Sequence, residues 1–334
     1  MGIRRGIAGL VAVASVVAGG TGLPSAASAA EVAATAADVG PPCVRENLTL
    51  PAGSWQRIDV VHADPSGRFQ LAYGTDTSWR EHVVRWDNGV PANLGTPPGS
   101  LGEINAQGDF VGNSYSEDGL YRSTAWRYSA GQVTTLPGLP DSVQTIASAI
   151  AGDGTVVGWV RSADGRATAV TWAPDDTVRA LPGAGDSRAI DVDADGTVIG
   201  FVAGKPVRWA PDAQPEQLPG YAGDPDAFWE LAGISAGVVV GQEHTGNTSL
   251  ALTWAPGAAP TLLAEGAVTH AVNARGSVAY EQTYENKQWL RRDGVDRALP
   301  SGSSPYSITD VAALTDDDIA YGNVSSTPVR WVCA

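Results

Sequence analysis

Three carboxylates at alternate positions, in the run Asp191-Val-Asp193-Ala-Asp195-Gly196, form the clearest chemical pattern in the sequence. Oxygen ligands with this spacing begin a calcium-binding loop, which also requires a bidentate acid at its twelfth position. Val202 occupies that position in this chain. Asp195-Gly196 also aligns with Gln107-Gly108 and Asp153-Gly154, two turn dipeptides of a repeat. The triplet therefore predicts a hairpin turn, with a calcium site as the alternative.

The four histidines are the side chains best suited to acid–base chemistry near neutral pH. His62 and His270 fall in or just before the first strand of a repeat, where either can approach the centre of a ring, and Glu243 and Glu281 are candidate acids. The chain lacks the HxxxH and HExxH spacings of metal sites and the glycine-rich loop that binds nucleotides. We therefore predict no catalytic residue, metal or cofactor, and retain a metal-assisted lyase or hydrolase at the channel mouth as an alternative.

Aromatic residues that the repeat does not require are the candidates for binding. They are Trp79, Tyr115, Tyr121, Trp159 and Tyr284, after the second strand of a repeat, and Tyr221, Phe228, Trp229 and Tyr306, between repeats. Both classes of connection are expected to open on one face of the repeated structure. Acids accompany them at Glu81, Glu117, Asp118, Asp224, Asp226, Glu230, Glu243 and Glu281. This mixture suits a protein partner, with a glycan as the alternative; a lectin usually repeats one site in every blade.

The elements that would position these residues are short strands in a sevenfold repeat. Residues 104–112 (INAQGDFVG), 150–158 (IAGDGTVVG) and 192–200 (VDADGTVIG) each join two apolar strands by a tight turn. Weaker copies end at Tyr73, Gly241, Tyr280 and Tyr321, with a period of about 41 residues. A strand ending in an aromatic, as in Val-Arg-Trp86, and a strand ending in Leu-Pro or Leu-Gly follow in most copies; Arg292 replaces the aromatic in the sixth. Four short strands per period predict an all-β, seven-bladed β-propeller.

The two ends of the chain are predicted to close the ring. The seventh copy lacks its Leu-Pro strand, and residues 48–53 (LTLPAG) supply a matching one at the N-terminal end, so an N-terminal strand is expected to complete the last blade. Cys43 precedes that strand and Cys333 follows Trp331. This placement predicts a disulfide, with free thiols or a metal pair as the alternatives.

Composition and charge limit the setting of the protein. Residues 1–30 combine Arg4-Arg5, an apolar stretch and a run of small residues, which predicts a cleaved signal peptide; the export route stays open. Residues 31–42 are expected to be a flexible lead-in, and residues 43–334 the propeller. The formal net charge of −15 argues against nucleic acid or an anionic membrane as partner. A secreted, extracellular monomer is expected.

The order of motifs resembles a known family. Ile-Asn-x-x-Gly-x-x-Val-Gly followed by Ala-x-x-Trp and Leu-Pro-Gly is similar to the HAF-type extracellular repeats of secreted actinobacterial β-propellers, and the resemblance covers about 290 residues. In size, leader and closed ring, the chain also resembles secreted propellers of the Dispase autolysis-inducing type. That resemblance implies an extracellular metalloprotease and a transglutaminase as partners. Transglutaminase requires reachable glutamines, and Gln56, Gln70, Gln107, Gln132, Gln144, Gln282 and Gln288 are expected in or beside turns and loops.

Overall fold

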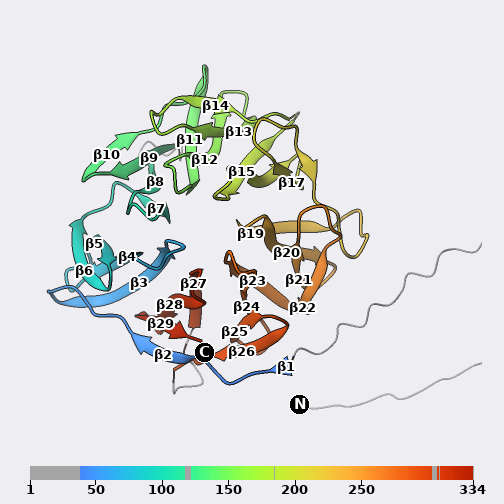
Figure 1. Ribbon diagram of the computed structural model, residues 1–334. Helices are drawn as coiled ribbons and strands as arrows, with labels where there is room; N and C mark the ends of the chain where they lie inside the picture. The colour runs from blue at the N-terminus through green and yellow to red at the C-terminus, as the bar shows by residue number, and fades with distance from the viewer. Residues whose placement is uncertain (1–37, 117–121, 184, 303–306, 308, 334) are drawn as a thin grey trace, which may run out of the picture. The chain divides into compact units, whose positions relative to one another are not determined.

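The computed structural model describes residues 38–116, 122–183, 185–302, 307 and 309–333. The leader and most of the lead-in expected from the sequence lie outside this range. Every regular element within it is a β-strand, and the strands form seven sheets arranged as blades around a central channel (Figure 1). The predicted all-β, seven-bladed propeller is thereby confirmed. No helix in this part of the chain is long and apolar enough to cross a membrane.

The first four blades each contain four antiparallel strands, which are named below in order from the channel outward. Blade 1 has β3 (Trp55–Ala63), β4 (Phe69–Asp76), β5 (Glu81–Asp87) and β6 (Val90–Gly95). Blade 2 has β7 (Ser100–Ile104), β8 (Phe110–Tyr115), β9 (Ser123–Ser129) and β10 (Gln132–Thr135). Blade 3 has β11 (Ser142–Ile150), β12 (Val156–Ser162), β13 (Ala167–Trp172) and β14 (Val178–Ala180), and blade 4 has β15 (Ser187–Val192), β16 (Val198–Val202), β17 (Lys205–Trp209) and β18 (Glu216–Gln217).

The remaining three blades include the strands that close the ring. Blade 5 has β19 (Phe228–Ser235), β20 (Val238–Thr245), β21 (Thr248–Trp254) and β22 (Thr261–Glu265). Blade 6 has β23 (Ala267–Val272), β24 (Val278–Gln282), β25 (Lys287–Arg292) and β26 (Val295–Leu299), with β1 (Asp38–Val39) added in parallel outside β26. Blade 7 has β27 (Thr309–Leu314), β28 (Ile319–Val324), β29 (Thr327–Val332) and, outermost, β2 (Val44–Asn47).

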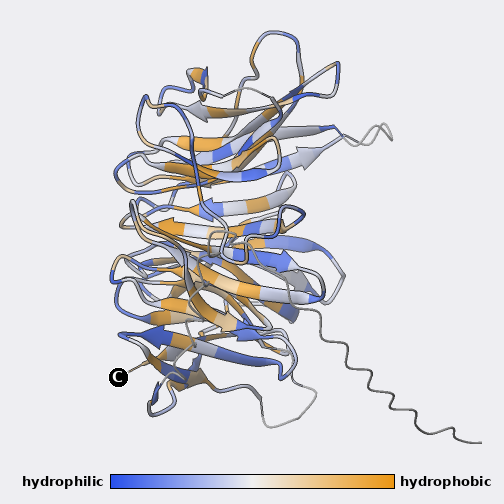
Figure 2. Ribbon diagram, turned by 90° about the vertical axis from the view of Figure 1, so that its right-hand side faces the viewer, coloured by the Kyte–Doolittle hydropathy of each residue, from blue (hydrophilic) through white to orange (hydrophobic). Residues whose placement is uncertain are grey.

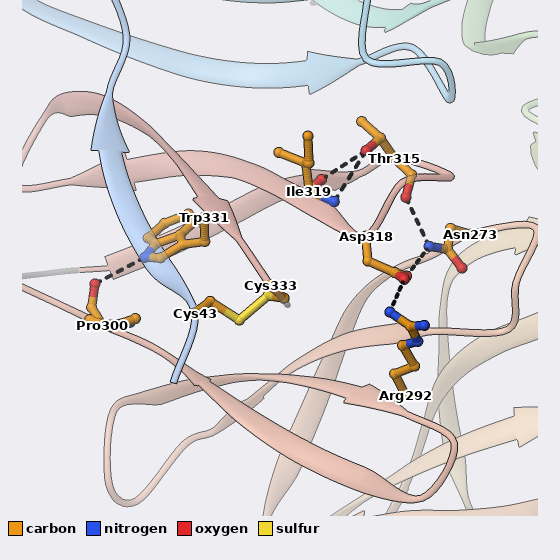
Figure 3. The surroundings of a disulfide bond; sticks show 9 residues. All are labelled: Cys43, Asn273, Arg292, Pro300, Thr315, Asp318, Ile319, Trp331 and Cys333. Atoms are coloured by element: carbon orange, nitrogen blue, oxygen red, sulfur yellow. Dashed lines mark hydrogen bonds and ion pairs between the residues drawn. A yellow bond between two sulfur atoms is a disulfide. The ribbon is translucent and has the colours of Figure 1, made fainter. Parts of the chain in front are cut away.

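Closure uses an N-terminal strand, as predicted, but not the predicted residues. The outer strand of blade 7 is β2, which pairs antiparallel with β29 from Val44↔Val332 to Asn47↔Val329, rather than residues 48–53. Trp86 Nε1 donates to the carbonyl of Thr49, as four equivalent tryptophans do to the residue after a repeat leucine. Leu48 is therefore the leucine of this copy, and Leu50, assigned that role by the sequence, is 47% exposed. The predicted Cys43–Cys333 disulfide lies beside this strand (Figure 3).

Indole hydrogen bonds connect successive blades. Four buried tryptophans at the end of third strands donate Nε1 to a proline carbonyl of the preceding blade, at 2.7–3.0 Å: Trp172 to Pro137, Trp209 to Pro182, Trp254 to Pro219 and Trp331 to Pro300. In blade 6 this position belongs to Arg291, which pairs with Val278 and donates Nη1 to Leu263 O at 2.6 Å. The sequence alignment placed Arg292 there, one residue too late.

Apolar side chains between the blades form the core. The buried residues fall into seven clusters, most of which draw on two neighbouring blades. Figure 2 shows the apolar positions concentrated in the stacked strands. The connections leave two faces. The loop face comprises the connections between second and third strands and those from blade to blade, and the turn face comprises the turns between first and second strands.

Candidate functional site

The loop face carries large aromatic side chains in open positions. Trp79 is 75% exposed, Tyr115 55%, Phe228 60% and Tyr284 83%. All four were predicted from the sequence to be binding residues. Trp79 and Tyr115 lie on neighbouring blades 1 and 2, and Phe228 and Tyr284 on neighbouring blades 5 and 6. Tyr121 and Tyr306, also predicted, lie outside the described residues.

Three other predicted binding residues are covered. Trp229 is 7% exposed and packs on Trp254 with 6.2 Å between ring centroids. It follows Phe228 in β19, and because side chains alternate along a strand, Phe228 faces outward and Trp229 inward. Trp159 lies within β12 rather than in a loop. Tyr221 is half-buried and packs against the blade 4–5 core.

The backbone at Trp79 is held in a conformation that side chains seldom adopt. Its φ is 62°, a left-handed value that is uncommon for a bulky residue. The Trp79 N–H donates to Asp76 O, as the Gly165 N–H donates to Ser162 O in the matching hairpin of blade 3. Trp79 thus occupies a glycine position and gains little burial in return. An exposed residue retained against its backbone preference is a candidate for function.

Carboxylates of the loop face differ in role. Glu243, predicted to be a surface acid, is fully buried, and its oxygens accept hydrogen bonds from the N–H groups of Tyr221 and Ala222. It therefore anchors the connection from blade 4 to blade 5. Glu81 is exposed, and no ion pair of its carboxylate occurs among the described residues. Glu117 and Asp118 fall in the part that the structure does not describe.

The central channel is the second candidate site. A cavity of about 580 Å³, lined by inner strands of all seven blades, contains His62 and His270, as the sequence predicted for the two histidines. Burial lowers the pKa of His62 to about 4 and also lowers that of His270, although Glu281 Oε2, 3.6 Å from His270 Nε2, opposes the second shift. Both imidazoles are therefore neutral at pH 7.

Two acids in the channel each connect one blade to the next. Glu103 of β7 accepts a hydrogen bond from the Ile150 N–H of blade 3, and Asp191 of β15 accepts one from the Ile234 N–H of blade 5. Burial raises the pKa of Asp191 to about 6 and raises that of Glu103 well above its usual range, with the Asp191 charge adding to the Glu103 shift. Sequence reasoning missed Glu103, because only the ring places it near Asp191.

This pair predicts a dependence of stability on pH. Each carboxyl has a higher pKa folded than unfolded, so the folded state retains protons that the unfolded state releases, and stability falls as pH rises. For Asp191 this fall runs from about pH 4 to about pH 6. We expect Asp191→Asn to gain about 2 kcal/mol relative to the wild type between pH 4 and pH 7, since one pKa unit is worth about 1.4 kcal/mol and part of the shift is already expressed at pH 4. Urea unfolding at both pH values measures this difference; a constant difference between the two proteins would contradict it.

Two sequence patterns, one typical of a calcium loop and one of a hydrolase nucleophile, lie in hairpin turns. The Asp193 carboxylate accepts hydrogen bonds from the N–H groups of Ala194 and Gly237. The Asp195 carboxylate accepts one from the N–H of Thr197, as the turn interpretation requires. Residues 233–237 (GISAG) match the Gly-x-Ser-x-Gly spacing of a hydrolase nucleophile, a spacing that the sequence interpretation wrongly took to be absent. Ser235 pairs with Val238 across the β19–β20 turn, whereas that motif joins a strand to a helix.

Comparisons with known proteins place the chain in a fold class. No family model and no curated protein sequence matches it. A solved structure of an inactive variant of virginiamycin B lyase from Staphylococcus aureus with quinupristin is 13% identical, with a TM-score of 0.57, over 87% of this chain and 99% of that one. YCF48 from Cyanidioschyzon merolae is 9% identical, with a TM-score of 0.53, over 86% and 98%. These similarities show a shared fold, the β-propeller, and nothing finer.

Proposed function

We propose that this protein is a non-enzymatic β-propeller that binds another protein through its loop face. The observation that carries the proposal is Trp79, a largely exposed tryptophan held at a glycine-like backbone position. Tyr115, Phe228 and Tyr284 add exposed aromatic surface on the same face. Large, rigid aromatic side chains dominate the energetics of protein interfaces, so the loop face is suited to binding another protein.

The partner that we propose is extracellular, in the manner of the Dispase autolysis-inducing type. The disulfide supports an oxidising compartment, and the leader-like N-terminus and HAF-type repeats support secretion. An extracellular metalloprotease and a transglutaminase are the proposed partners. Gln56, Gln107 and Gln132 are exposed and suit cross-linking, whereas Gln70 and Gln288 are each only 2% exposed, contrary to the sequence expectation.

The exposed aromatics favour a protein over a glycan. Trp79 and Tyr284 lie in connections between strands, Tyr115 ends a second strand, and Phe228 begins a first strand. They do not repeat one site from blade to blade, as lectin propellers usually do. The alternative of a metal-assisted lyase has no metal site to support it within the described ranges, where no three His, Cys, Asp or Glu residues come together as ligands.

Partner capture tests the proposal. We expect Trp79→Ala with Tyr284→Ala to reduce, by at least about ten-fold, the protein retained from native culture medium, because each buried interface aromatic contributes roughly 2 kcal/mol. Mass spectrometry of the retained material would identify a protease or a transglutaminase. Val133→Ala, at a 51% exposed position on the outer strand of blade 2, serves as control. Equal capture by both variants and the wild type would show that the loop face is not the binding surface.

A further inference from the structure

A cleft lies on the loop face between blades 1 and 2. The described residues enclose about 510 Å³, with Tyr73, Pro97 and Tyr115 as apolar walls and Arg57, Asp59 and Glu81 as charged ones. Ser100, at the start of β7, also lines the cleft. Trp79 lies in the β4–β5 hairpin that also supplies Glu81. The cleft thus adjoins the most unusual aromatic of the face.

The boundary between blades 3 and 4 shows how the same location is filled elsewhere in the ring. There the ring of Trp159 has two guanidinium groups over it, those of Arg161 and Arg188, each 5.2 Å from the ring centroid. Arg188 comes from the inner strand of the following blade and crosses the boundary. Such cation–π contacts are worth about 0.5–2 kcal/mol.

Strand register establishes which residues are equivalent at the two boundaries. Each inner strand has a bulge, and the last pair before it is Val60↔Ala72 in blade 1 and Ala147↔Gly158 in blade 3. The next residue along the second strand is Tyr73 in one and Trp159 in the other. Leu101↔Gly112 in blade 2 and Ala189↔Gly200 in blade 4 are likewise the last pairs before the bulge of their inner strands, so they are equivalent.

It follows that Ser100 is the counterpart of Arg188, and Thr75 the counterpart of Arg161. The aromatic platform is present in both places, as Tyr73 and as Trp159. At the blade 1–2 boundary, however, a serine and a threonine stand where the blade 3–4 boundary has its two arginines. Arg188 covers the ring of Trp159, whereas the shorter side chain of Ser100 leaves an open cleft beside Tyr73.

The charges in the cleft favour a cation. Arg57 Nε is 3.2 Å from Asp59 Oδ2 and 3.4 Å from Thr75 Oγ1, so its charge is offset within the wall. Glu81 remains, exposed and without an ion pair among the described residues. The cleft therefore has a formal excess of one negative charge, and two tyrosines line it.

We propose that this cleft binds an arginine side chain of the protein partner, which takes the place that Arg188 fills at the blade 3–4 boundary. The guanidinium would stack on Tyr73 or Tyr115 and pair with Glu81. Arginine suits both contacts, because its planar guanidinium stacks on aromatic rings and forms forked hydrogen bonds to carboxylates. This inference rests on the proposed function, since it names the chemistry that the loop face recognises.

A peptide titration tests the proposal. The probe is acetyl-Ala-Arg-Ala-amide, with the citrulline peptide as its neutral isostere, followed by NMR chemical shifts of the labelled protein. We expect saturable binding of the arginine peptide to the wild type and at least about ten-fold weaker binding of the citrulline peptide. Equal binding of the two peptides, or no saturable shift with arginine, would overturn it.

Two variants localise the site. Ser100→Arg should fill the cleft from within and Glu81→Gln should remove its carboxylate, and each is expected to weaken the arginine peptide by about ten-fold. Glu265→Gln, an exposed acid in blade 5, should leave binding unchanged. Thermal melting tests whether Ser100→Arg is folded, and Glu81→Gln, at an exposed position, tests the site independently of that variant. Wild-type affinity in both folded variants contradicts the site.

Partner capture separates this inference from the proposed function. If Trp79→Ala with Tyr284→Ala abolishes capture while Ser100→Arg and Glu81→Gln do not, the loop face binds a protein and the arginine site is wrong. If none of these variants affects capture, the proposed function itself is wrong.

Discussion

Replacing Cys43 and Cys333 with alanine should lower the free energy of unfolding by about 5 kcal/mol, the chain-entropy value for a closed loop this long. The bond joins residues 290 apart in sequence, so its removal increases the conformational entropy of nearly the whole unfolded propeller chain. For a domain of this size, the change corresponds to about 10 °C in Tm. Differential scanning calorimetry of the variant measures the change directly.

The wild type under reducing conditions is the matched control for this variant. It should melt at the same temperature as the alanine variant, and adding reductant to the variant should have no effect. Circular dichroism at 25 °C should match in both, because β2 and β29 remain paired through four residue pairs. A Tm within about 2 °C of the oxidised wild type would mean that strand pairing alone closes the ring.

Truncating one of the bridging tryptophans is the second large effect. Trp254→Ala should cost about 3–5 kcal/mol, because the residue is fully buried in the blade 4–5 core and donates its indole to Pro219 O at 2.9 Å. Trp254→Phe should cost less, since it retains most of the packing and loses chiefly the hydrogen bond, which is worth about 1 kcal/mol. Equilibrium urea unfolding gives both values.

Trp79→Ala is the control for this comparison, because Trp79 is 75% exposed. It should be neutral or slightly stabilising, since alanine at a left-handed φ is no worse than tryptophan and little packing is lost. If Trp254→Ala cost less than about 1 kcal/mol, the indole contacts between blades would not be a principal source of stability.

The architecture was predictable because one pattern recurs in every blade. A turn of Asn, Asp and Gly, a buried aromatic and a leucine before a strand end each answer a local requirement of a blade, so repetition reinforced a weak signal. Register was less accessible. Leu48 and Leu50 both fit the outer-strand pattern, and only the folded ring distinguishes them, through the exposure of Leu50 and the Trp86 hydrogen bond to Thr49.

The binding residues were predictable only in part, for a similar reason. Phe228 and Trp229 are adjacent and both aromatic, and their opposite exposure depends on the alternation of β19, which no local signal fixed. The cleft was not accessible at all. The cleft depends on the equivalence of Ser100 and Arg188. Sequence spacing does not reveal this equivalence, because the bulges of blades 2 and 4 differ in length.

The pairing of β2 with β29 has a consequence for the order of events during synthesis. β2 is made before all of the blades, whereas its partner, Thr327–Val332, is made after the other six blades. Blades 1 to 5 can assemble from contiguous chain, whereas blade 7 is complete only after β29 has been made. Contacts between such distant residues form slowly. Until then, β2 keeps an unpaired edge, and ring closure is the step at which a growing chain is most exposed to mispairing with another molecule.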